Sequence, residues 1–217
     1  MLKKLIKKII PLSLEVPFKY YYNFFIGTLE YELNIIDYIL RPGDRAIDVG
    51  ANRGVYSYKL WKNCINIEIF EPNPICVKVL SAWINNKSSI NLHAHALSNK
   101  DGFATLNIPI DENGVEHDAS ASLNNLNFIH KRSEDVSIRS LDSYNFSNVS
   151  FIKIDVEGHE RLVLEGAKKT LLNHKPSLLI EIEQRHSSDS INMIFDYLTN
   201  LDYEGFFFVN NLGVVVY

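Results

Sequence analysis

Short apolar runs alternate with stretches of helical periodicity through most of the chain. Runs typical of buried strands occupy residues 45–49, 66–70, 149–154 and 177–182, and helix-like stretches follow them at 55–63, 74–85, 160–172 and 188–201. Strands of a parallel sheet read as nearly continuous apolar runs because helices cover both faces of the sheet. The alternation therefore predicts a doubly wound α/β fold with a mostly parallel sheet.

The segments between these units are less regular. Residues 90–97 read as a strand, and the spacing of Ala104, Leu106 and Ile108 predicts another. Residues 206–209 and 214–217 predict a hairpin and hence one reversed edge strand. Residues 111–135 are polar, and we expect them to form one long loop, which in a compact domain usually serves a function or is disordered.

The first 40 residues differ from the rest, and we expect a helical extension preceding a domain that spans 41–217. A helix-like segment covers 29–40. Lys3, Lys4, Lys7 and Lys8 are set among apolar residues that would share one helical face. Such a helix either makes a peripheral contact with an anionic membrane or packs on the domain or on a second subunit, and packing is favoured. Its apolar run is far too short to span a bilayer.

Composition narrows the range of partners. A chain of 217 residues with 46% apolar content can bury one good core, and its net charge of −4 argues against nonspecific nucleic-acid binding. A small molecule or a glycan is the expected partner. Two cysteines, Cys64 and Cys76, are too few for a disulfide scaffold, so we expect a cytoplasmic protein, peripheral at the inner face of a membrane if the basic helix binds lipid.

Candidate chemistry begins where the first predicted central strand ends. Asp48 leads into a G-x-N-x-G turn formed by Gly50, Asn52 and Gly54, and a helix follows. The glycines allow a tight turn and a close approach of backbone to ligand, and the start of a helix offers free N–H groups. The three-glycine dinucleotide fingerprint is absent. By itself the turn is equally consistent with a cofactor cradle and with an ordinary strand–helix loop.

Acids stand at the ends of the other predicted strands. Ligands of doubly wound sheets bind outside these carboxyl ends, so the acids are candidates for one site. Glu71 lies about twenty residues beyond the glycine turn, where an acid accepts both hydroxyls of a ribose. The alternative is that Glu71 interacts with a helix dipole. Asp155 and Glu157 follow the strand at 149–154, and Glu181 and Glu183 follow the next one.

With these residues assembled, the chain resembles the FkbM-type family of S-adenosylmethionine-dependent methyltransferases. The resemblance covers most of the chain and lies in residues 48–54 (DVGANRG), 70–74 (FEPNP), 96–102 (ALSNKDG) and 151–160 (FIKIDVEGHE), with support at 140–142, 175–177 and 180–183. It implies the Rossmann-like class I methyltransferase fold, a mostly parallel seven-stranded sheet with one antiparallel edge strand. It also implies methyl transfer, typically to a hydroxyl of a saccharide or another small metabolite.

The resemblance implies a cofactor site residue by residue. Residues around the methionine end of S-adenosylmethionine would be Asp48, Gly50, Asn52 and Gly54. Glu71 would hold the ribose, Asn73 would lie near the adenine, and Ala96 and Leu97 would border the base. The strand-end position of Asp155 lets its carboxylate face the sulfonium or the incoming nucleophile.

Methyl transfer to a hydroxyl requires orientation of the reactants and removal of a proton. The candidate catalytic residues are Asp155, Glu157, His159 and His186. Three of them have a structural alternative: Asp155 would also serve as an acid at a helix start, and either histidine would also serve as a surface residue.

Four carboxylates at two adjacent strand ends require a cation. One solution is a divalent metal such as Mg²⁺ with oxygen ligands. The other is Lys153, which shares side-chain parity with Asp155 and could pair with Glu181 on the neighbouring strand. We favour the lysine and predict no metal.

Two other functions fit parts of the pattern. A nicotinamide-dependent dehydrogenase uses a similar sheet, but the missing third glycine argues against it. A membrane-attached scaffold that has lost its chemistry would keep the same fold. The acceptor pocket would draw on the N-terminal aromatic residues and on the 111–135 loop, where His117, Asp118, His130, Lys131 and Arg132 would suit a glycan or an anion. Tyr20, Tyr21, Tyr22, Phe24 and Phe25 would suit a homodimer contact.

Overall fold

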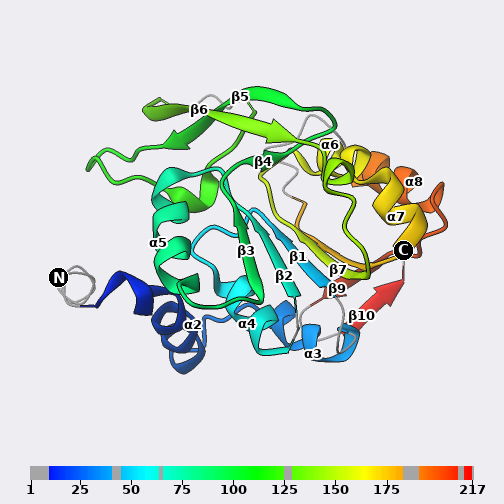
Figure 1. The fold of residues 1–217 in the computed structure, drawn as a ribbon, viewed down its shortest axis with the longest axis horizontal. Coiled ribbons are helices and arrows are strands. Elements are labelled where there is room, and N and C mark those ends of the chain that lie inside the picture. Colours follow the sequence, from blue (N-terminus) through cyan, green and yellow to red (C-terminus); the bar gives the residue numbers. More distant parts are fainter. Residues whose placement is uncertain are drawn as a thin grey trace.

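Among the residues that the structure describes, the central sheet has five parallel strands in the order β3-β2-β1-β7-β8 (Figure 1). The computed structural model describes residues 10–40, 45–63, 66–124, 129–182, 191–209 and 213–216. The strands are β1 (Arg45–Val49), β2 (Asn66–Phe70), β3 (Ile90–His93), β7 (Val149–Ile154) and β8 (Ser177–Ile180). All the pairings within this sheet are parallel, as the continuous apolar runs predict.

Alternate side chains of the central strands are buried on opposite faces of the sheet. On one face Ala46, Ile67 and Phe151 pack with residues of α2 (Glu15–Phe25), α4 (Val55–Asn63) and α5 (Pro74–Ile84). On the other face Ile47 and Ile152 pack with residues of α6 (Glu160–Gly166), α7 (Lys168–His174) and α8 (Ile191–Thr199). Helices thus cover both faces, and the doubly wound α/β prediction is confirmed.

The predicted seven-stranded sheet is wrong for the described residues. The strands β9 (Phe206–Val209) and β10 (Gly213–Val216) form the predicted antiparallel hairpin, but they pair only with each other. The single strand predicted at 90–97 is also wrong. A bend at Ala94 and His95 takes the chain out of the central sheet after β3, and β4 (Ala96–Leu97) pairs with β6 in a separate sheet of order β4-β6-β5.

The predicted loop over 111–135 is wrong at its C-terminal end. The strand β6 (Lys131–Arg139) pairs through Lys131 to Ile138 with β5 (Gly102–Pro109), and β5 confirms the strand predicted from the spacing of Ala104, Leu106 and Ile108. The first half of β6 carries charged and polar side chains, most of them outside the core, so hydrophobic alternation carries no signal. The three-stranded sheet lies across the end of the central sheet (Figure 1).

Two helices differ from their predicted extents. The helix predicted at 160–172 is broken at Ala167 into α6 and α7. The helix-like segment at 29–40 contains only a 3₁₀ turn, η2 (Tyr31–Asn34), and one α-helical turn, α3 (Ile36–Ile39). The predicted first residues of α4 and α5 are confirmed. The helix α5 begins with Pro74, and the side chain of Asn73 caps it by accepting the backbone N–H of Ile75.

The N-terminal part packs directly on the domain. Val16 of α2, together with Leu33 and Ile36, is buried in the same cluster as the strands and α4. A short 3₁₀ turn, η1 (Leu12–Leu14), precedes α2. The basic helix predicted for the first ten residues falls almost wholly outside the described residues. Within the described part of the chain, no helix is long and apolar enough to cross a membrane.

Candidate functional site

A small cavity lies at the carboxyl ends of β1, β2 and β7. Its walls include Gly50, Asn52, Glu71, Asp155 and His159. Across the cavity lie Leu106 of β5 and the segment that contains η3 (Asp118–Ser120). Four of the predicted strand-end residues, Gly50, Glu71, Asp155 and Glu157, therefore line one cavity together with a segment that the sequence places in a loop.

The G-x-N-x-G turn has left-handed backbone at each of its three motif residues. The φ angles are +78° at Gly50, +49° at Asn52 and +75° at Gly54. A Cβ added at Gly50 would lie 1.8 Å from the carbonyl oxygen of Asp155, and one added at Gly54 would lie 2.7 Å from a methyl group of Leu80. Both glycines are therefore required by conformation and by close packing.

Glu71 is the best-anchored acid of the site. Its carboxylate accepts the backbone N–H of Asn52 on Oε2 at 2.6 Å and that of Asn73 on Oε1 at 2.7 Å. Burial raises the pKa of Glu71 to about 7 against the opposing effect of these two N–H donors. Each carboxylate oxygen has a second lone pair, so the group can still accept two hydroxyls.

Asp48 lies behind the turn and does not line the cavity. It is fully buried, and the hydroxyl of Ser57 on α4 donates to its Oδ2 at 2.5 Å. Its Oδ1 has no hydrogen-bond partner within the described structure. Burial raises the pKa of Asp48, and the nearby Lys153 opposes that rise. That Asp48 lies near the methionine end of S-adenosylmethionine stays a prediction.

Lys153 is the cation at this acidic edge. Its Nζ lies 2.8 Å from Oδ2 of Asp155 and 4.6 Å above the ring of Tyr56. Burial alone would lower the pKa of Lys153, but Asp155 and Asp48 outweigh it and the pKa is raised. Glu181, the predicted partner of Lys153, also contributes to the raised pKa, and the 2.8 Å contact is with Asp155. Within the described ranges, no group of three or more His, Cys, Asp or Glu residues could hold a metal.

The candidate bases lie in different surroundings. Glu157 lines the cavity with a left-handed φ of +50°, and its carbonyl accepts the hydroxyl of Ser122 at 2.7 Å. His159 is buried at the start of α6, with Nε2 3.0 Å from the Ser98 hydroxyl and Nδ1 without a partner in the described part of the chain. Burial lowers its pKa, so the ring is neutral at pH 7. His186 and Glu183 lie outside the described residues.

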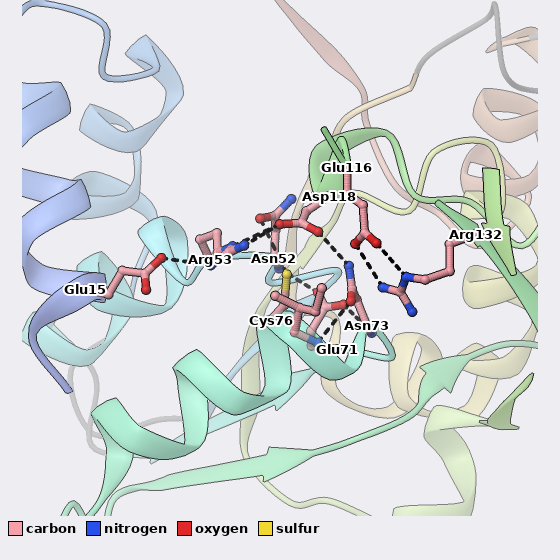
Figure 2. Close-up of polar contacts among 10 residues, drawn as sticks. Glu15, Asn52, Arg53, Glu71, Asn73, Cys76, Glu116, Asp118 and Arg132 are labelled. Carbon is pink, nitrogen blue, oxygen red and sulfur yellow. Dashed lines mark hydrogen bonds and ion pairs between the residues drawn. The ribbon is translucent and has the colours of Figure 1, made fainter. Parts of the chain in front are cut away.

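Asp118 joins the covering segment to the cofactor turn. Its Oδ2 accepts from Arg53 at 3.1 Å and 2.5 Å, and its Oδ1 accepts from the side chain of Asn73 at 3.1 Å (Figure 2). Arg53 also donates to Glu15 of α2 at 2.8 Å. From the sequence we expect Asp118 only in the acceptor pocket. The contacts of Arg53 with Asp118 and Glu15 could not be predicted, because 65 and 38 residues of chain separate the partners and no local pattern reveals such pairs.

Further contacts hold the covering segment at both ends. Arg132 at the start of β6 donates to Glu116 at 2.8 Å and 3.1 Å (Figure 2). The amide of Asn124 donates to the carbonyl of Gly158 at 2.8 Å. The cavity measures about 60 Å³, room for a few water molecules and well below the roughly 300 Å³ at which pockets for small organic ligands begin.

A family model described as "Methyltransferase FkbM domain" matches residues 48–204. The chain belongs to the FkbM methyltransferase family. The matched range contains all the motif segments that carry the resemblance seen in the sequence, from 48–54 to 180–183, and that resemblance is confirmed. A search of curated proteins gives no match.

Two solved structures are similar to this chain at low sequence identity, and the first of them supports the fold. The FkbM methyltransferase from Methylobacillus flagellatus has a TM-score of 0.55 and 16% identity, over 94% of this chain and 53% of that one. This chain therefore spans about half the length of that FkbM methyltransferase. TrmK of M. capricolum, solved with S-adenosyl-homocysteine, has a TM-score of 0.44 and 13% identity, over 86% of this chain and 65% of that one.

Proposed function

We propose that this FkbM-family protein is an S-adenosylmethionine-dependent methyltransferase that methylates a hydroxyl group on a saccharide or small metabolite. The observation that carries the proposal is the Glu71 carboxylate. It stands at the end of β2 beside the glycine turn, and two backbone N–H groups hold both of its oxygens. A carboxylate fixed in this way is ready to accept the two hydroxyls of a ribose.

The remaining walls suit a nucleoside. Ala96, Leu97 and Phe70 are apolar residues of the same cavity and offer surfaces against a base. The Asn73 side chain accepts from Ile75 and donates to Asp118, so its part in adenine binding requires Asp118 to move. The family resemblance implies that Gly50 and Asn52 lie at the methionine end. When bound, S-adenosylmethionine supplies a methyl group on a positively charged sulfur.

The acidic wall suits a cationic centre. Asp155 lines the cavity, and its contact with Lys153 fixes the direction of its carboxylate. His159 is our candidate for removing the proton of the acceptor hydroxyl, because burial keeps its ring neutral and its Nδ1 has no partner among the described residues. Asp155 and Glu157 are the alternative bases.

Calorimetric titration with S-adenosylhomocysteine, and with NAD for comparison, tests the proposal. We expect binding of the first and none of the second. Glu71→Ala should weaken binding by roughly tenfold or more, since hydrogen bonds to a charged group are lost. Glu71→Gln keeps the size of the side chain, and its affinity should lie between those of the unmodified protein and Glu71→Ala. A far-ultraviolet circular dichroism spectrum and a thermal unfolding midpoint report whether each variant folds.

Glu204→Ala is the control because Glu204 is an exposed acid that does not line the cavity. Equal affinity of folded Glu71→Ala and the unmodified protein would remove Glu71 from the cofactor site. Binding of NAD would favour a dehydrogenase. Binding of neither compound would favour a scaffold without chemistry.

A further inference from the structure

The helix α2 has two faces of opposite exposure. Val16 is fully buried, and the ring of Tyr20 packs 5.0 Å from that of Tyr58 on α4. Leu14, Phe18, Tyr21 and Phe25 are all exposed. Their spacing of four, three and four residues places them along a single side of a helix. We name these four residues the α2 stripe.

The α2 stripe is too apolar for an ordinary solvated helix face. Phe25 is 80% exposed, and Phe24 and Ile26 beside it are also exposed. Contiguous apolar surface of this kind usually marks an interaction site. Figure 1 shows α2 at the outer edge of the described part of the molecule, away from the helices α6 to α8. The stripe therefore faces outward, where a large partner can reach it.

Charge indicates what the partner is. Residues 1–25 contain five lysines and one acid, although the whole chain has a net charge of −4. Four of those lysines, at positions 3, 4, 7 and 8, immediately precede the α2 stripe in the sequence. The stripe also ends near a cation, since Lys62 donates to the hydroxyl of Tyr21 at 3.0 Å. Lysine beside tyrosine and phenylalanine is the composition that favours the interface of an anionic bilayer.

A second copy of the chain fits the same surface less well. Most homodimers are two-fold symmetric, so each patch meets the same patch of its partner. Two copies of α2 in contact would bring two lysine-rich segments together, and like charges repel. An anionic lipid surface instead pairs the lysines with phosphate groups and buries the aromatic side chains.

We propose that the protein binds anionic membranes peripherally through the α2 stripe, with the side chains of Phe18 and Phe25 entering the interface and the net positive charge of residues 1–25 favouring anionic lipid. The proposal does not depend on the methyltransferase activity. It accounts for two independent features, the apolar side of a helix that packs on the domain by its other side and the basic sequence that leads into it.

Flotation with lipid vesicles tests the proposal on the full chain. We expect binding to phosphatidylcholine vesicles that contain phosphatidylglycerol and at least roughly tenfold weaker binding to pure phosphatidylcholine. The double variant Phe18→Ser with Phe25→Ser should lose tenfold or more on anionic vesicles, about what loss of two buried phenyl groups implies. Replacing Lys3, Lys4, Lys7 and Lys8 with Gln should remove the preference for anionic lipid.

Phe103→Ser is the matched control because Phe103 is 83% exposed but lies on β5, in another sheet. It should bind vesicles as the unmodified protein does. If the double variant does not fold, Phe25→Trp provides a second measurement, and its fluorescence should shift to the blue on anionic vesicles.

Three outcomes would overturn the proposal. The first is that the protein does not float with anionic vesicles, and the second is that Phe103→Ser reduces vesicle binding as much as the double variant does. The third is that light scattering shows a dimer, which the double variant disrupts, in a protein that does not bind vesicles.

Discussion

Two N–H groups of Arg53 donate to one carboxylate oxygen of Asp118, across 65 residues of sequence. Arg53 belongs to the glycine turn after β1, and Asp118 belongs to the segment that covers the cavity. The pair therefore fixes the covering segment over the candidate cofactor site. A cavity of about 60 Å³ is too small for a nucleoside, so residues 118–123 must move for one to bind.

Asp118→Asn should loosen the covering segment. The ion pair is largely shielded, with 17% and 14% of the two side chains exposed, and its loss should cost about 1–3 kcal/mol of unfolding free energy. Hydrogen exchange of the amides in 111–124 should quicken, and S-adenosylhomocysteine should associate faster. Urea unfolding, exchange and stopped-flow binding measure these effects.

Glu165→Gln provides the comparison because it removes the partly exposed pair with Arg161 within one helix. Its cost should stay below about 0.5 kcal/mol, as is usual for such pairs. If the amides of 111–124 exchange at the same rate in both variants, the Arg53–Asp118 pair does not hold the segment.

Gly50→Ala should be severely destabilising, whereas Gly114→Ala should not. Both glycines have a left-handed φ, +78° and +74°, so both substitutions cost about 1–2 kcal/mol of backbone strain. Only at Gly50 does the new Cβ meet backbone, 1.8 Å from the Asp155 carbonyl, while nothing lies within 4 Å at Gly114. Denaturant unfolding should separate the two variants by more than about 2 kcal/mol. Equal costs would show that the glycine turn can move away from β7.

The buried Glu71 makes stability depend on pH. Its folded pKa of about 7 lies above the ordinary value of 4.5, so the folded state disfavours the charged form. The stability linked to Glu71 is complete below about pH 4.5 and is lost as pH rises through 7. The unfolding free energy of the unmodified protein, relative to that of Glu71→Gln, should fall by at most roughly 3 kcal/mol from pH 5 to 8. A constant difference would show that the two N–H donors hold the carboxylate charged throughout.

His159 should have the opposite effect in acid. Burial lowers the pKa of His159 below the ordinary 6.5. As pH falls below 6.5, this histidine is therefore protonated in the unfolded chain before it is protonated in the folded chain. Its contribution to stability is present above pH 6.5 and is lost as pH falls towards the lowered pKa. His159→Gln should lose less stability than the unmodified protein between pH 7 and 5. The exposed His130 provides the control, since His130→Gln should follow the unmodified protein.

The sequence prediction of the fold succeeded where a run of apolar residues corresponds to a single buried strand. The runs 45–49, 66–70 and 149–154 form β1, β2 and β7 with those bounds because central strands are apolar on both faces. The prediction failed for β6, because the charged and polar side chains of its first half leave no hydrophobic alternation. It also failed at 90–97, because a change of direction at Ala94 leaves the apolar pattern uninterrupted.

Within the site, the sequence predicted residues that local chain geometry brings together. Gly50, Glu71 and Asp155 follow adjacent parallel strands, so the sheet alone gathers their side chains at one edge. The orientation of Asp48 toward Ser57 could not be predicted in the same way, since it depends on how α4 packs against β1. Side-chain parity places Lys153 and Asp155 on the same side of the chain, but only the structure shows that the lysine contacts this acid.

By itself the sequence determined the FkbM family, the alternation of strands and helices, and the strand-end residues of the candidate site, because those features are local patterns that repeat at fixed periods. Only the tertiary structure decided that β9 and β10 pair apart from the central sheet, that Asp118 covers the cavity through Arg53, and that one side of α2 faces outward. These features depend on contacts between residues far apart in the chain, and such contacts leave no periodic pattern in a single sequence.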